Sequence, residues 1–507
     1  MRHLIFILFC LTWFCCLECV AQDTYSKIYH IGVENYSSNF GESILELGND
    51  ELVIMCNGFD TLTNDKSSVS YLKLYTTSGD LISKSHYHNL PGSLKFEVFG
   101  NAVINSNSQI TVPGALDTNL MCLNLTAQGD SLGLLSLSTS TVSVAKKLIL
   151  DQSDNIIAAG FADDLGGWKN MLLVKWDENG NKLWHKTFES GAFDSATSLS
   201  FDHDGGYILC GPSNGFKDGA FTSWVIKTDT AGNKLWDLKL GELDKDLVQF
   251  PHRPLFYAHP DGNYIYSSYD DNTIIDDVFG LPFISMVDST GATLWRTDIP
   301  SIRGVTKIKV LKDGNVFLIS QGIVSQLKTN RIASIAKFNS TGDLLWHRFY
   351  SDHRAAENFY LYDVIEGSDG YLYATGAFDD QVTQPVTSYG VWLLKLDQNG
   401  CLEPDCEGDV VYLNSEHTTF LDEQSVLLKI FPNPVDNYLT VNIKSDLTAQ
   451  QKILLTDING KRIWEKLIKH GEQTLNYNTS DLPSGQYFLS VTVEGEKVLG
   501  KKVWVQH

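Results

Sequence analysis

The chain has 507 residues and 43% of them are hydrophobic, so the sequence folds but is too long for one ordinary core. Its 39 basic and 61 acidic residues give a net charge of −22. A surface of that charge repels nucleic acid and anionic lipid and attracts cations, which argues against a nucleic-acid-binding function.

The first 21 residues have the pattern of a secretory signal peptide. A basic start precedes an apolar run from Leu4 to Phe14, and small residues lead to a cleavage position between Ala21 and Gln22. A lipoprotein signal with Cys19 as the acceptor is the alternative, but Glu18 stands where a small residue is needed. Because no later stretch reaches about 18 uninterrupted apolar residues, we expect no transmembrane segment in the mature chain.

One phrase recurs along most of the chain. The segment VIKTDTAGNKLW, which ends at Trp236, has close copies that end at Trp184, Trp295 and Trp346, and weaker copies elsewhere. The turn glycines of all the copies follow one another at spacings of 50 to 59 residues: Gly79, Gly129, Gly180, Gly232, Gly291, Gly342 and Gly400. A recurrence at this period predicts an array of one supersecondary unit.

Each repeat divides into four short strands rich in Val, Ile, Leu, Tyr and Trp. Asp-Gly turns separate the first strand from the second, and glycine-containing turns separate the third from the fourth, because glycine supplies the positive φ that tight hairpins need. Four antiparallel strands per repeat of about 50 residues are typical of a β-propeller blade. A parallel β-helix would have a shorter period, and helical repeats would show 3.6-residue periodicity.

The two ends of the array predict its closure. The seventh repeat reaches GVWLLKLDQNG and continues as CLEPDC, without a fourth strand, while the mature chain begins with an extra strand, YSKIYHIG. If that strand completes the last repeat, residues 22–406 form an all-β, seven-bladed β-propeller with no open strand edges. The recurring tryptophans are then expected to pack between blades.

The repeated phrase, which ends in Leu-Trp and is called the LW phrase below, also resembles the tryptophan-docking repeat of pyrroloquinoline-quinone dehydrogenases, which are propellers. The resemblance covers about a dozen residues per blade and implies the fold. Those enzymes carry an adjacent cysteine pair near the cofactor, whereas the adjacent pair here, Cys15-Cys16, lies in the signal peptide. No quinone cofactor is therefore expected.

The remaining cysteines suggest a structural role. Cys401 and Cys406 bracket a tight loop of an exported chain, which predicts a disulfide. Cys56 and Cys210 occupy equivalent strand positions, so we expect them to be buried small apolar side chains. No cysteine and histidine spacing indicates zinc.

The composition changes after residue 406. Residues 407–426 are polar and unrepeated, which predicts a linker, and residues 427–507 show short alternating strands and tight turns typical of a small β-sandwich. This last segment closely resembles the type A C-terminal sorting domain of the type IX secretion system. The residues that carry the resemblance, in three blocks, are Pro432, Asn433, Pro434, Asp457, Gly460, Pro483, Gly485 and Tyr487.

The resemblance implies a route and a partner. The signal peptide would take the chain across the inner membrane, and the type IX secretion machinery would take it from the periplasm to the cell surface or the medium. An ordinary terminal sandwich with no sorting role is the alternative.

Possible ligand-binding residues gather in one set of loops. Turns between strands one and two and between strands three and four share one face of a propeller, so the loops between strands two and three lie on the other face. Several of these loops carry acidic residues, some beside aromatics: Asp163, Asp164, Trp168, Asp270, Asp271, Asp379 and Asp380. Such carboxylates could bind Ca²⁺ or a hydroxyl-rich ligand such as a glycan. The alternative is that they only cap their loops.

The sequence contains no nucleophile motif, phosphate-binding loop or metal-binding motif. We therefore expect an exported binding or adhesion module for an extracellular ligand, with glycan as a candidate and Ca²⁺ as the one candidate cofactor. The alternative is an extracellular glycan hydrolase or lyase that uses two of the loop carboxylates, at a separation that a sequence does not give.

Overall fold

The computed structural model describes residues 24–507 apart from a set of internal segments. These segments are 32–35, 61–66, 88–93, 96–100, 117–118, 138–141, 164–166, 217–220, 244–252, 276–277, 323–331, 353–356, 381–387, 404–405, 407, 414, 421–425, 446–450, 458–460, 470 and 494–495. The signal peptide predicted over residues 1–21 lies outside the described residues. The described residues form β-strands and connecting turns without any helix, as an all-β fold requires.

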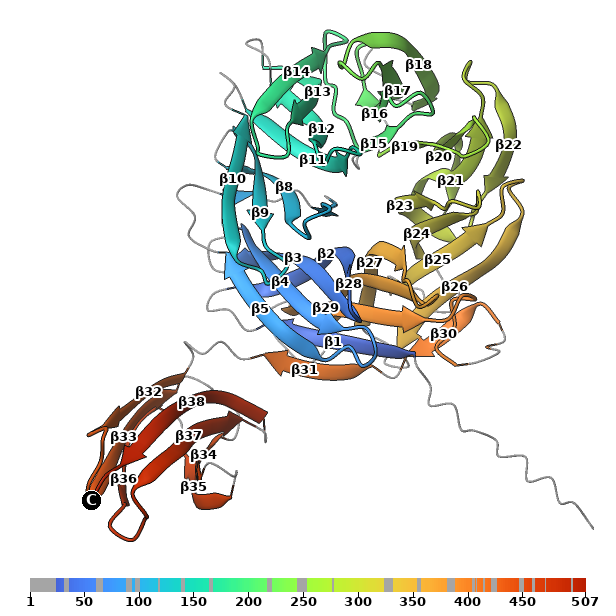
Figure 1. Ribbon diagram of the computed structural model, residues 1–507. Helices are drawn as coiled ribbons and strands as arrows, with labels where there is room; N and C mark the ends of the chain where they lie inside the picture. Colours follow the sequence, from blue (N-terminus) through green and yellow to red (C-terminus); the bar gives the residue numbers. More distant parts are fainter. Residues whose placement is uncertain are drawn as a thin grey trace, which may run out of the picture.

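Most sheets contain four consecutive antiparallel strands in chain order, and we name each such unit by its first strand. Figure 1 shows these units following one another around a common centre. Three sheets consist of one unit each: β11 (Ser143–Leu150), β12 (Ile156–Asp163), β13 (Lys169–Trp176) and β14 (Lys182–Phe188); β15 (Ser198–Phe201), β16 (Tyr207–Ser213), β17 (Phe221–Thr228) and β18 (Lys234–Leu243); β19 (Leu255–Ala258), β20 (Tyr264–Ile275), β21 (Val278–Val287) and β22 (Thr293–Asp298).

Two sheets have five strands. In the β6 unit the first position is shared by two short strands: β6 (Leu94–Lys95), β7 (Val103–Ile104), β8 (Ile110–Leu116), β9 (Asn119–Leu125) and β10 (Ser131–Leu137). The β23 unit gains an outer strand from a distant part of the chain: β23 (Ile302–Val310), β24 (Val316–Gly322), β25 (Ile332–Phe338), β26 (Leu344–Asp352) and β30 (Val410–Leu413).

The remaining nine-stranded sheet holds the beginning and the end of the array. Its first unit is β2 (Tyr36–Gly48), β3 (Glu51–Asp60), β4 (Ser67–Tyr75) and β5 (Leu81–Tyr87). Its second part is β27 (Glu357–Glu366), β28 (Leu372–Asp380), β29 (Ser388–Leu396), β1 (Tyr25–Ile31) and β31 (Glu416–Phe420). A single parallel pair, Ser38 with Tyr389, joins the two parts.

The N-terminal strand β1 supplies the fourth strand of the β27 unit. It pairs antiparallel with β29, with Ile28 opposite Trp392, and parallel with β31 on its other edge. The strand predicted from YSKIYHIG therefore lies where the last repeat lacks one, and β31 covers its outer side.

Two strands lie within residues 407–426, which the sequence predicts as a linker. β30 pairs parallel with β26, and β31 pairs parallel with β1, so this segment adds outer strands to two neighbouring units. The runs VVYL and HTTF are rich in residues that favour strands, but their partners are distant in the sequence.

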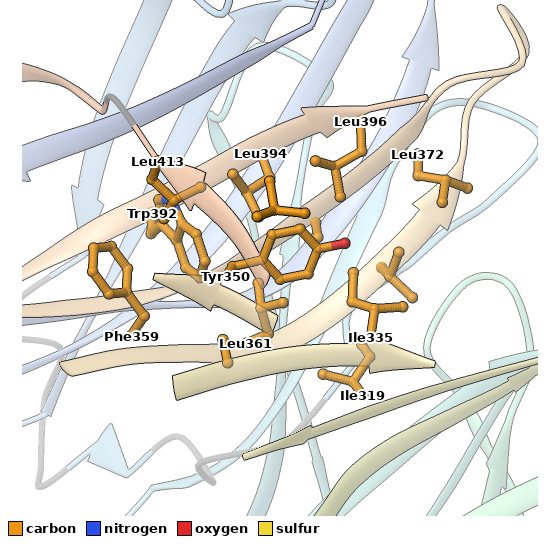
Figure 2. Packing of buried hydrophobic residues seen from close by; sticks show 14 of the residues in the cluster. Ile319, Ile335, Tyr350, Phe359, Leu361, Leu372, Trp392, Leu394, Leu396 and Leu413 are labelled. Atoms are coloured by element: carbon orange, nitrogen blue, oxygen red, sulfur yellow. The ribbon is translucent and has the colours of Figure 1, made fainter. Parts of the chain in front are cut away.

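A separate apolar core lies between each unit and the next. Figure 2 shows the core between the β23 and β27 units, where Trp392, Tyr350 and Phe359 pack with aliphatic side chains and with Leu413 of β30. An equivalent core contains Tyr29 of β1, Ile54 of β3 and residues of β28 and β29, so the last unit packs on the first. Each unit therefore has both of its faces buried against neighbours, a continuous arrangement of cores around the centre.

The repeated phrase places an outer side chain against the turn glycine of the following unit. A Cβ added at Gly342 would lie 2.5 Å from the ring of Trp295, and one added at Gly232 would lie 2.7 Å from that of Trp184. Between the last unit and the first, the corresponding neighbour of Gly79 is Tyr25 of β1. Glycine recurs in these turns because they need positive φ and because a side chain would collide with the preceding unit.

The C-terminal segment forms two sheets around one core. One sheet is β32 (Val426–Phe431), β33 (Tyr438–Ser445) and β36 (Gly471–Asn478), and the other is β34 (Gln451–Asp457), β35 (Arg462–Ile468), β37 (Gly485–Val493) and β38 (Glu496–Val505). Side chains of both sheets, among them Val441, Leu455 and Leu489, are fully buried in the same apolar cluster.

A comparison of Gly342→Ala with Gly262→Ala measures how much the contact between a turn glycine and a tryptophan ring contributes to stability. Both glycines have positive φ, but a Cβ at Gly262 would meet nothing within 4 Å. We expect Gly262→Ala to cost about 1 kcal/mol of unfolding free energy through its backbone conformation. We expect Gly342→Ala to cost a further amount, about 1–3 kcal/mol, because its Cβ displaces the Trp295 ring. Urea denaturation measures both, and equal losses would show that the ring contact does not stabilise the fold.

Candidate functional site

Charged side chains from five different units interact electrostatically across the inner strands, and we call them the axial cluster. Lys147 of β11 interacts electrostatically with Lys307 of β23, Asp363 of β27, Arg253 just before β19, and Glu42 of β2. Groups from five units approach one another only where the units converge. The cluster therefore belongs to the inner strands of the units, which face the common centre in Figure 1.

A bulge and a glycine fix the register of the innermost strands. The pairing of β11 with β12 shifts between Ala145 and Lys147, and β2, β23 and β27 show the same irregularity. On the second strand, Gly160 lies so close to β11 that an added Cβ would be 1.9 Å from the Val144 carbonyl oxygen. Gly211 and Gly376 show the same close approach to their inner strands. The residue that follows each bulge thus takes an equivalent place near the axis.

At this equivalent place, most units carry a side chain that accepts a hydrogen bond from the next unit. The bonds run from Ala102 N to Ser43 Oγ (3.1 Å), from Leu148 N to Asn101 Oδ1 (3.1 Å), from Phe256 N to Ser198 Oγ (3.2 Å) and from Ile44 N to Asp363 Oδ2 (3.1 Å). Each satisfies a backbone N–H that would otherwise be buried without a partner. The β11 and β23 units have Lys147 and Lys307 here, and a lysine ammonium cannot accept a hydrogen bond.

Asp363 joins the last unit to the first. The residue is 4% exposed, and one oxygen of its carboxylate accepts hydrogen bonds from Ile44 N and Ser43 Oγ of β2. The other oxygen accepts from Val364 N (2.8 Å) and from Lys307 Nζ (2.5 Å). Four donors, one of them the ammonium of Lys307, compensate the burial of this charge, so Asp363 acts as a positioning residue of the axis.

Burial is the main cause of an unusual pKa at Lys147. Together with the positive charges of Lys307 and Arg253, and against the attraction of Asp363 and Glu42, burial lowers the pKa of Lys147 to about 7. A buried ammonium is destabilised relative to the neutral amine, and nearby like charges add to that effect. Near neutral pH, Lys147 therefore exists in both protonation states.

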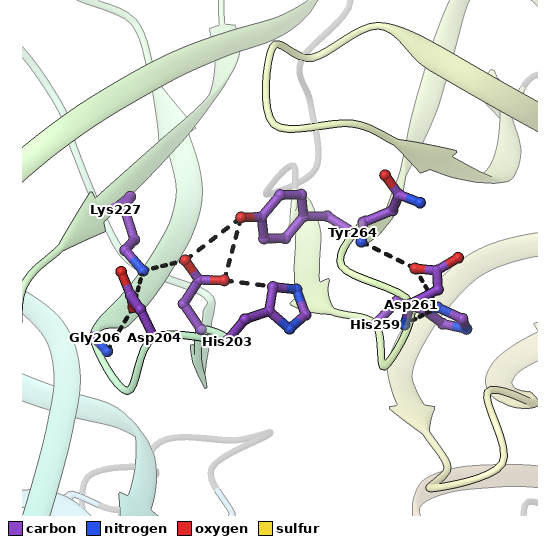
Figure 3. A network of polar contacts seen from close by, with 9 residues as sticks. His203, Asp204, Gly206, Lys227, His259, Asp261 and Tyr264 are labelled. Carbon is purple, nitrogen blue, oxygen red and sulfur yellow. Dashed lines mark hydrogen bonds and ion pairs between the residues drawn. The ribbon is translucent and has the colours of Figure 1, made fainter.

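A second polar network, at the turns between first and second strands, serves the fold. Figure 3 shows Lys227, His203 and Tyr264 around the turn after β15, where Lys227 forms ion pairs with Asp202 and Asp204. Equivalent pairs recur in other units: Lys73–Glu51, Lys175–Asp151 and Lys395–Asp369, with N–O distances of 2.7, 2.8 and 3.3 Å. A contact repeated in four units fastens a turn to a strand, and it does not define one ligand site.

His259, in the same network, links two neighbouring units. Its Nε2 lies 2.8 Å from the carbonyl oxygen of Gly314, and its Nδ1 lies 2.8 Å from Asp261 Oδ1. The side chain is buried at 2% exposure, so it bridges the β19 and β23 units rather than facing a substrate.

The predicted loop residues are described only in part. Asp163 ends β12 opposite Lys169, and Trp168 is 51% exposed in the same connection. Asp379, in β28, is 1% exposed and accepts a hydrogen bond from Asn358 Nδ2 at 3.3 Å. Asp163 and Asp379 belong to units that are not neighbours in the order of the array.

The remaining predicted residues lie beyond what the structure describes. Asp164 falls in an undescribed segment, and the side chains of Asp270, Asp271 and Asp380 are not described, although their backbones belong to β20 and β28. Among the described residues, no group of three or more His, Cys, Asp or Glu side chains could hold a metal ion. Ca²⁺ binding by these loops stays a prediction.

Sequence reasoning missed the axial cluster. No local pattern connects Arg253 with Lys147 or Lys307. A signal was available: when the repeats are aligned on the inner strands, AKK and TKIK place lysines where three other repeats have Ser or Asn.

The motif residues of the C-terminal segment hold its strands together. Asn433 donates to the carbonyl oxygen of Lys502 and accepts from Trp504 N, at 2.9 and 2.8 Å, and so fixes the last strand, β38. The Tyr487 hydroxyl donates to the Pro483 carbonyl oxygen at 2.9 Å, and Asp457 Oδ1 accepts from Lys461 N at 2.9 Å. Pro432 and Pro434 flank Asn433, Gly485 begins β37, and Gly460 lies outside the described residues.

Cys401 and Cys406 form a disulfide just after the last complete hairpin of the array. Cys56, Cys122 and Cys210 are buried free thiols. Burial raises the pKa of the Cys122 thiol to about 12, so this cysteine is held as an unreactive apolar side chain.

Comparison with known proteins identifies the C-terminal segment. Residues 429–506 match the family described as the secretion system C-terminal sorting domain. A search of curated proteins finds no match to the chain. In the described part of the chain, no helix has the length and apolar character needed to cross a membrane.

Solved structures show only distant similarity. A protein from Lactobacillus plantarum is 11% identical over 69% of this chain and 98% of its own, with a TM-score of 0.41. A protein of unknown function from Dyadobacter fermentans is 10% identical over 73% of this chain and 98% of its own, with a TM-score of 0.40. Drosophila Plexin A, solved in complex with Semaphorin 1b, is 10% identical over 74% of this chain and 87% of its own, with a TM-score of 0.40.

The sorting domain defines the class of this protein: an all-β protein exported by type IX secretion. It is secreted or held at the outer cell surface, and the type IX secretion machinery handles it on the way.

The pKa of Lys147 predicts a pH dependence of stability. Between about pH 7 and its ordinary pKa of 10.5, the unfolded chain binds a proton at Lys147 that the folded chain does not. Stability therefore rises with pH across this window, by up to about 5 kcal/mol. Lys147→Met should remove that rise and stabilise the fold at about pH 6.

Urea denaturation at about pH 6 and about pH 9 measures this prediction. The matched control is Lys182→Met, which removes one lysine from an exposed position on β14 and should keep the rise. An unchanged pH dependence in Lys147→Met would show that this amine is charged in the fold.

Proposed function

We propose that the array of units is a seven-bladed β-propeller that acts outside the cell as a binding or adhesion module. Three observations support the fold: the two parts of the nine-stranded sheet bring the number of four-stranded units to seven, an apolar core separates every neighbouring pair, and β1 completes the last unit. The C-terminal pair of sheets is then a β-sandwich that serves export.

The observation that carries the binding proposal is the axial cluster. Charged side chains from five units interact electrostatically, and two units carry lysines at the place where Ser43, Asn101 and Ser198 complete hydrogen bonds between units. Ligand sites are commonly built where many elements converge and contribute a few polar groups each. The ligand class that we propose is an extracellular glycan, which enters from the face of the loops between second and third strands.

A glycan array probed with the mature chain, residues 22–507, tests this function, with product analysis of each hit to detect hydrolysis or elimination. We expect retention of a limited set of glycans without turnover. Absence of any hit from a folded sample would contradict the proposal, and turnover of a hit would favour an enzyme.

The loop carboxylates are tested by paired substitution: Asp163→Asn with Asp164→Asn, Asp270→Asn with Asp271→Asn, and Asp379→Asn with Asp380→Asn. We expect each pair that contacts the ligand or Ca²⁺ to weaken glycan binding about tenfold or to abolish Ca²⁺-dependent thermal stabilisation. The control is Asp313→Asn on the opposite face, where the amide can still accept from Asn315 N. If the three pairs match the parent protein, the aspartates only cap their loops.

Export is tested by truncation after Phe420. This cut removes residues 421–507 and keeps β30 and β31, which pair with β26 and β1. We expect the truncated protein to fold and to accumulate in the periplasm, because the sorting domain is missing. Immunoblots of periplasm and medium from the native cell measure this, with the full chain as control, and normal amounts outside the cell would contradict it.

A further inference from the structure

The last unit of the array lacks a covalent connection that the other units have. In the β15 unit, for example, Asp229 N donates to the Asn233 carbonyl oxygen at 2.9 Å, and the chain leaves this turn directly as the fourth strand, β18. In the β27 unit the same turn closes between Asp397 N and the Cys401 carbonyl oxygen at 3.0 Å, but the fourth strand is β1, from the other end of the chain. The junction between this turn and its fourth strand therefore depends on non-covalent contacts.

A disulfide lies at this junction. Cys401 is the last residue of the turn, where it is 2% exposed and its backbone N donates to Asp397 Oδ1 at 2.8 Å. It is bonded to Cys406, which packs together with Leu402 against the apolar core between the β23 and β27 units. We call Cys401, Leu402 and Cys406 the disulfide loop. Because the bond joins its two ends, the Leu402 carbonyl oxygen is held beside the turn.

The disulfide loop contacts the start of β1. The hydroxyl of Thr24, the residue just before β1, donates a hydrogen bond to the Leu402 carbonyl oxygen. Within β1, Ser26 Oγ accepts from Trp392 Nε1 of β29 at 3.0 Å and lies 2.7 Å from Ser415 Oγ. The disulfide loop, β29 and the segment that leads into β31 thus hold the first residues of β1 together.

The disulfide loop also leads into the two added outer strands. Shortly after Cys406, the carbonyl oxygen of Asp409 accepts a hydrogen bond from Phe349 N of β26 at 2.7 Å. β30 and β31 follow, and β31 pairs with β1, as Figure 1 shows. The bond between Cys401 and Cys406 therefore sets the point at which the chain leaves the turn and begins to follow β26.

We propose that this disulfide is a redox-sensitive latch of the last unit: its formation holds β1 beside β29 and β30 along β26, and both strands open more readily in the reduced chain. The proposal does not depend on the binding function proposed above. In the described part of the chain, the other cysteines, Cys56, Cys122 and Cys210, are buried free thiols, so a change of redox state acts at this junction.

Closing the latch is an oxidation. The thiolate of one cysteine attacks the disulfide of an oxidised thiol oxidoreductase, and the thiolate of the other cysteine then attacks the resulting mixed disulfide. The bond between Cys401 and Cys406 forms, and the two electrons and two protons lost by the thiols pass to the oxidoreductase, which leaves as a dithiol. Because cytosolic thiols are kept reduced, the latch stays open until the exported chain has left the cytosol.

Hydrogen exchange measured by mass spectrometry tests the proposal on residues 22–507, oxidised and after reduction with tris(2-carboxyethyl)phosphine. We expect the amides of β1 and β30 to exchange at least about tenfold faster in the reduced protein, because the cross-link no longer restricts the loop that holds them. Exchange in β16 and β17, the middle strands of the β15 unit, should not change.

Three variants locate the effect. Cys401→Ala with Cys406→Ala should exchange like the reduced parent and should not respond to the reductant, which excludes other actions of the reductant. Thr24→Val removes the donor to Leu402 and keeps the disulfide, so we expect faster exchange in β1 alone. The matched control is Thr293→Val at an exposed position at the start of β22, which should leave exchange in β1 unchanged.

Two results would contradict the latch. Equal exchange of β1 in the oxidised and reduced parent, with loss of the disulfide verified by mass, overturns the proposal. Faster exchange in every unit of the reduced parent also overturns it, since the disulfide would then stabilise the whole array rather than this junction.

Discussion

The pairing of β1 with β29 is the interaction on which the rest of the structure depends. It supplies the fourth strand of the β27 unit and places Tyr25 and Tyr29 against the turn at Gly79 in the first complete unit. Lys27 adds an ion pair with Asp80 at 2.9 Å. Without these contacts the last unit would have an open edge, and the core between the last unit and the first would lose its β1 side chains.

The axial cluster follows from this closure. Asp363 reaches Ser43 and Ile44 only because the β27 unit lies against the β2 unit, and its position in turn fixes Lys307. The innermost strands, four of them bulged and several paired at close-approach glycines, bring equivalent residues of the units to the same level. This register joins neighbouring units through hydrogen bonds to Ser43, Asn101 and Ser198. It also brings Lys147 and Lys307 within electrostatic range of each other.

Local chemistry made much of the fold predictable. The turn glycines, the LW phrase and the missing strand after GVWLLKLDQNG together predict four-stranded repeats and a β1 strand that completes the last one, and β1 does pair with β29. These features depend on hairpins and on neighbours about 50 residues apart. β30 and β31 were missed because their partners, β26 and β1, lie far away in the sequence and pair with them in parallel.

The site was less predictable for a related physical reason. Acidic loop residues such as Asp163 and Asp379 stand out in the sequence as charges beside turns, whereas Lys147, Arg253 and Lys307 come from three separate repeats and look like ordinary strand residues. What brings them together is the register of the inner strands, which bulges shift by one residue. Alternation of polar and apolar residues along a strand does not show where such a shift occurs.

The place of β1 also sets an order for folding. Ile28 of β1 is opposite Trp392 of β29. The first strand to be synthesised therefore stays unpaired until its partner, 364 residues later in the chain, has been made. Each four-stranded unit can form from local contacts while the rest of the chain is still being made. The final step, which joins the two ends of the array, is slow because closing so long a loop costs conformational entropy. Until then, both β1 and the edge of β29 are unpaired strands, which are prone to associate with other chains. The periplasm is therefore the compartment in which this protein is most exposed to aggregation, and β31, which pairs along β1, closes over that edge only after the last unit has been made.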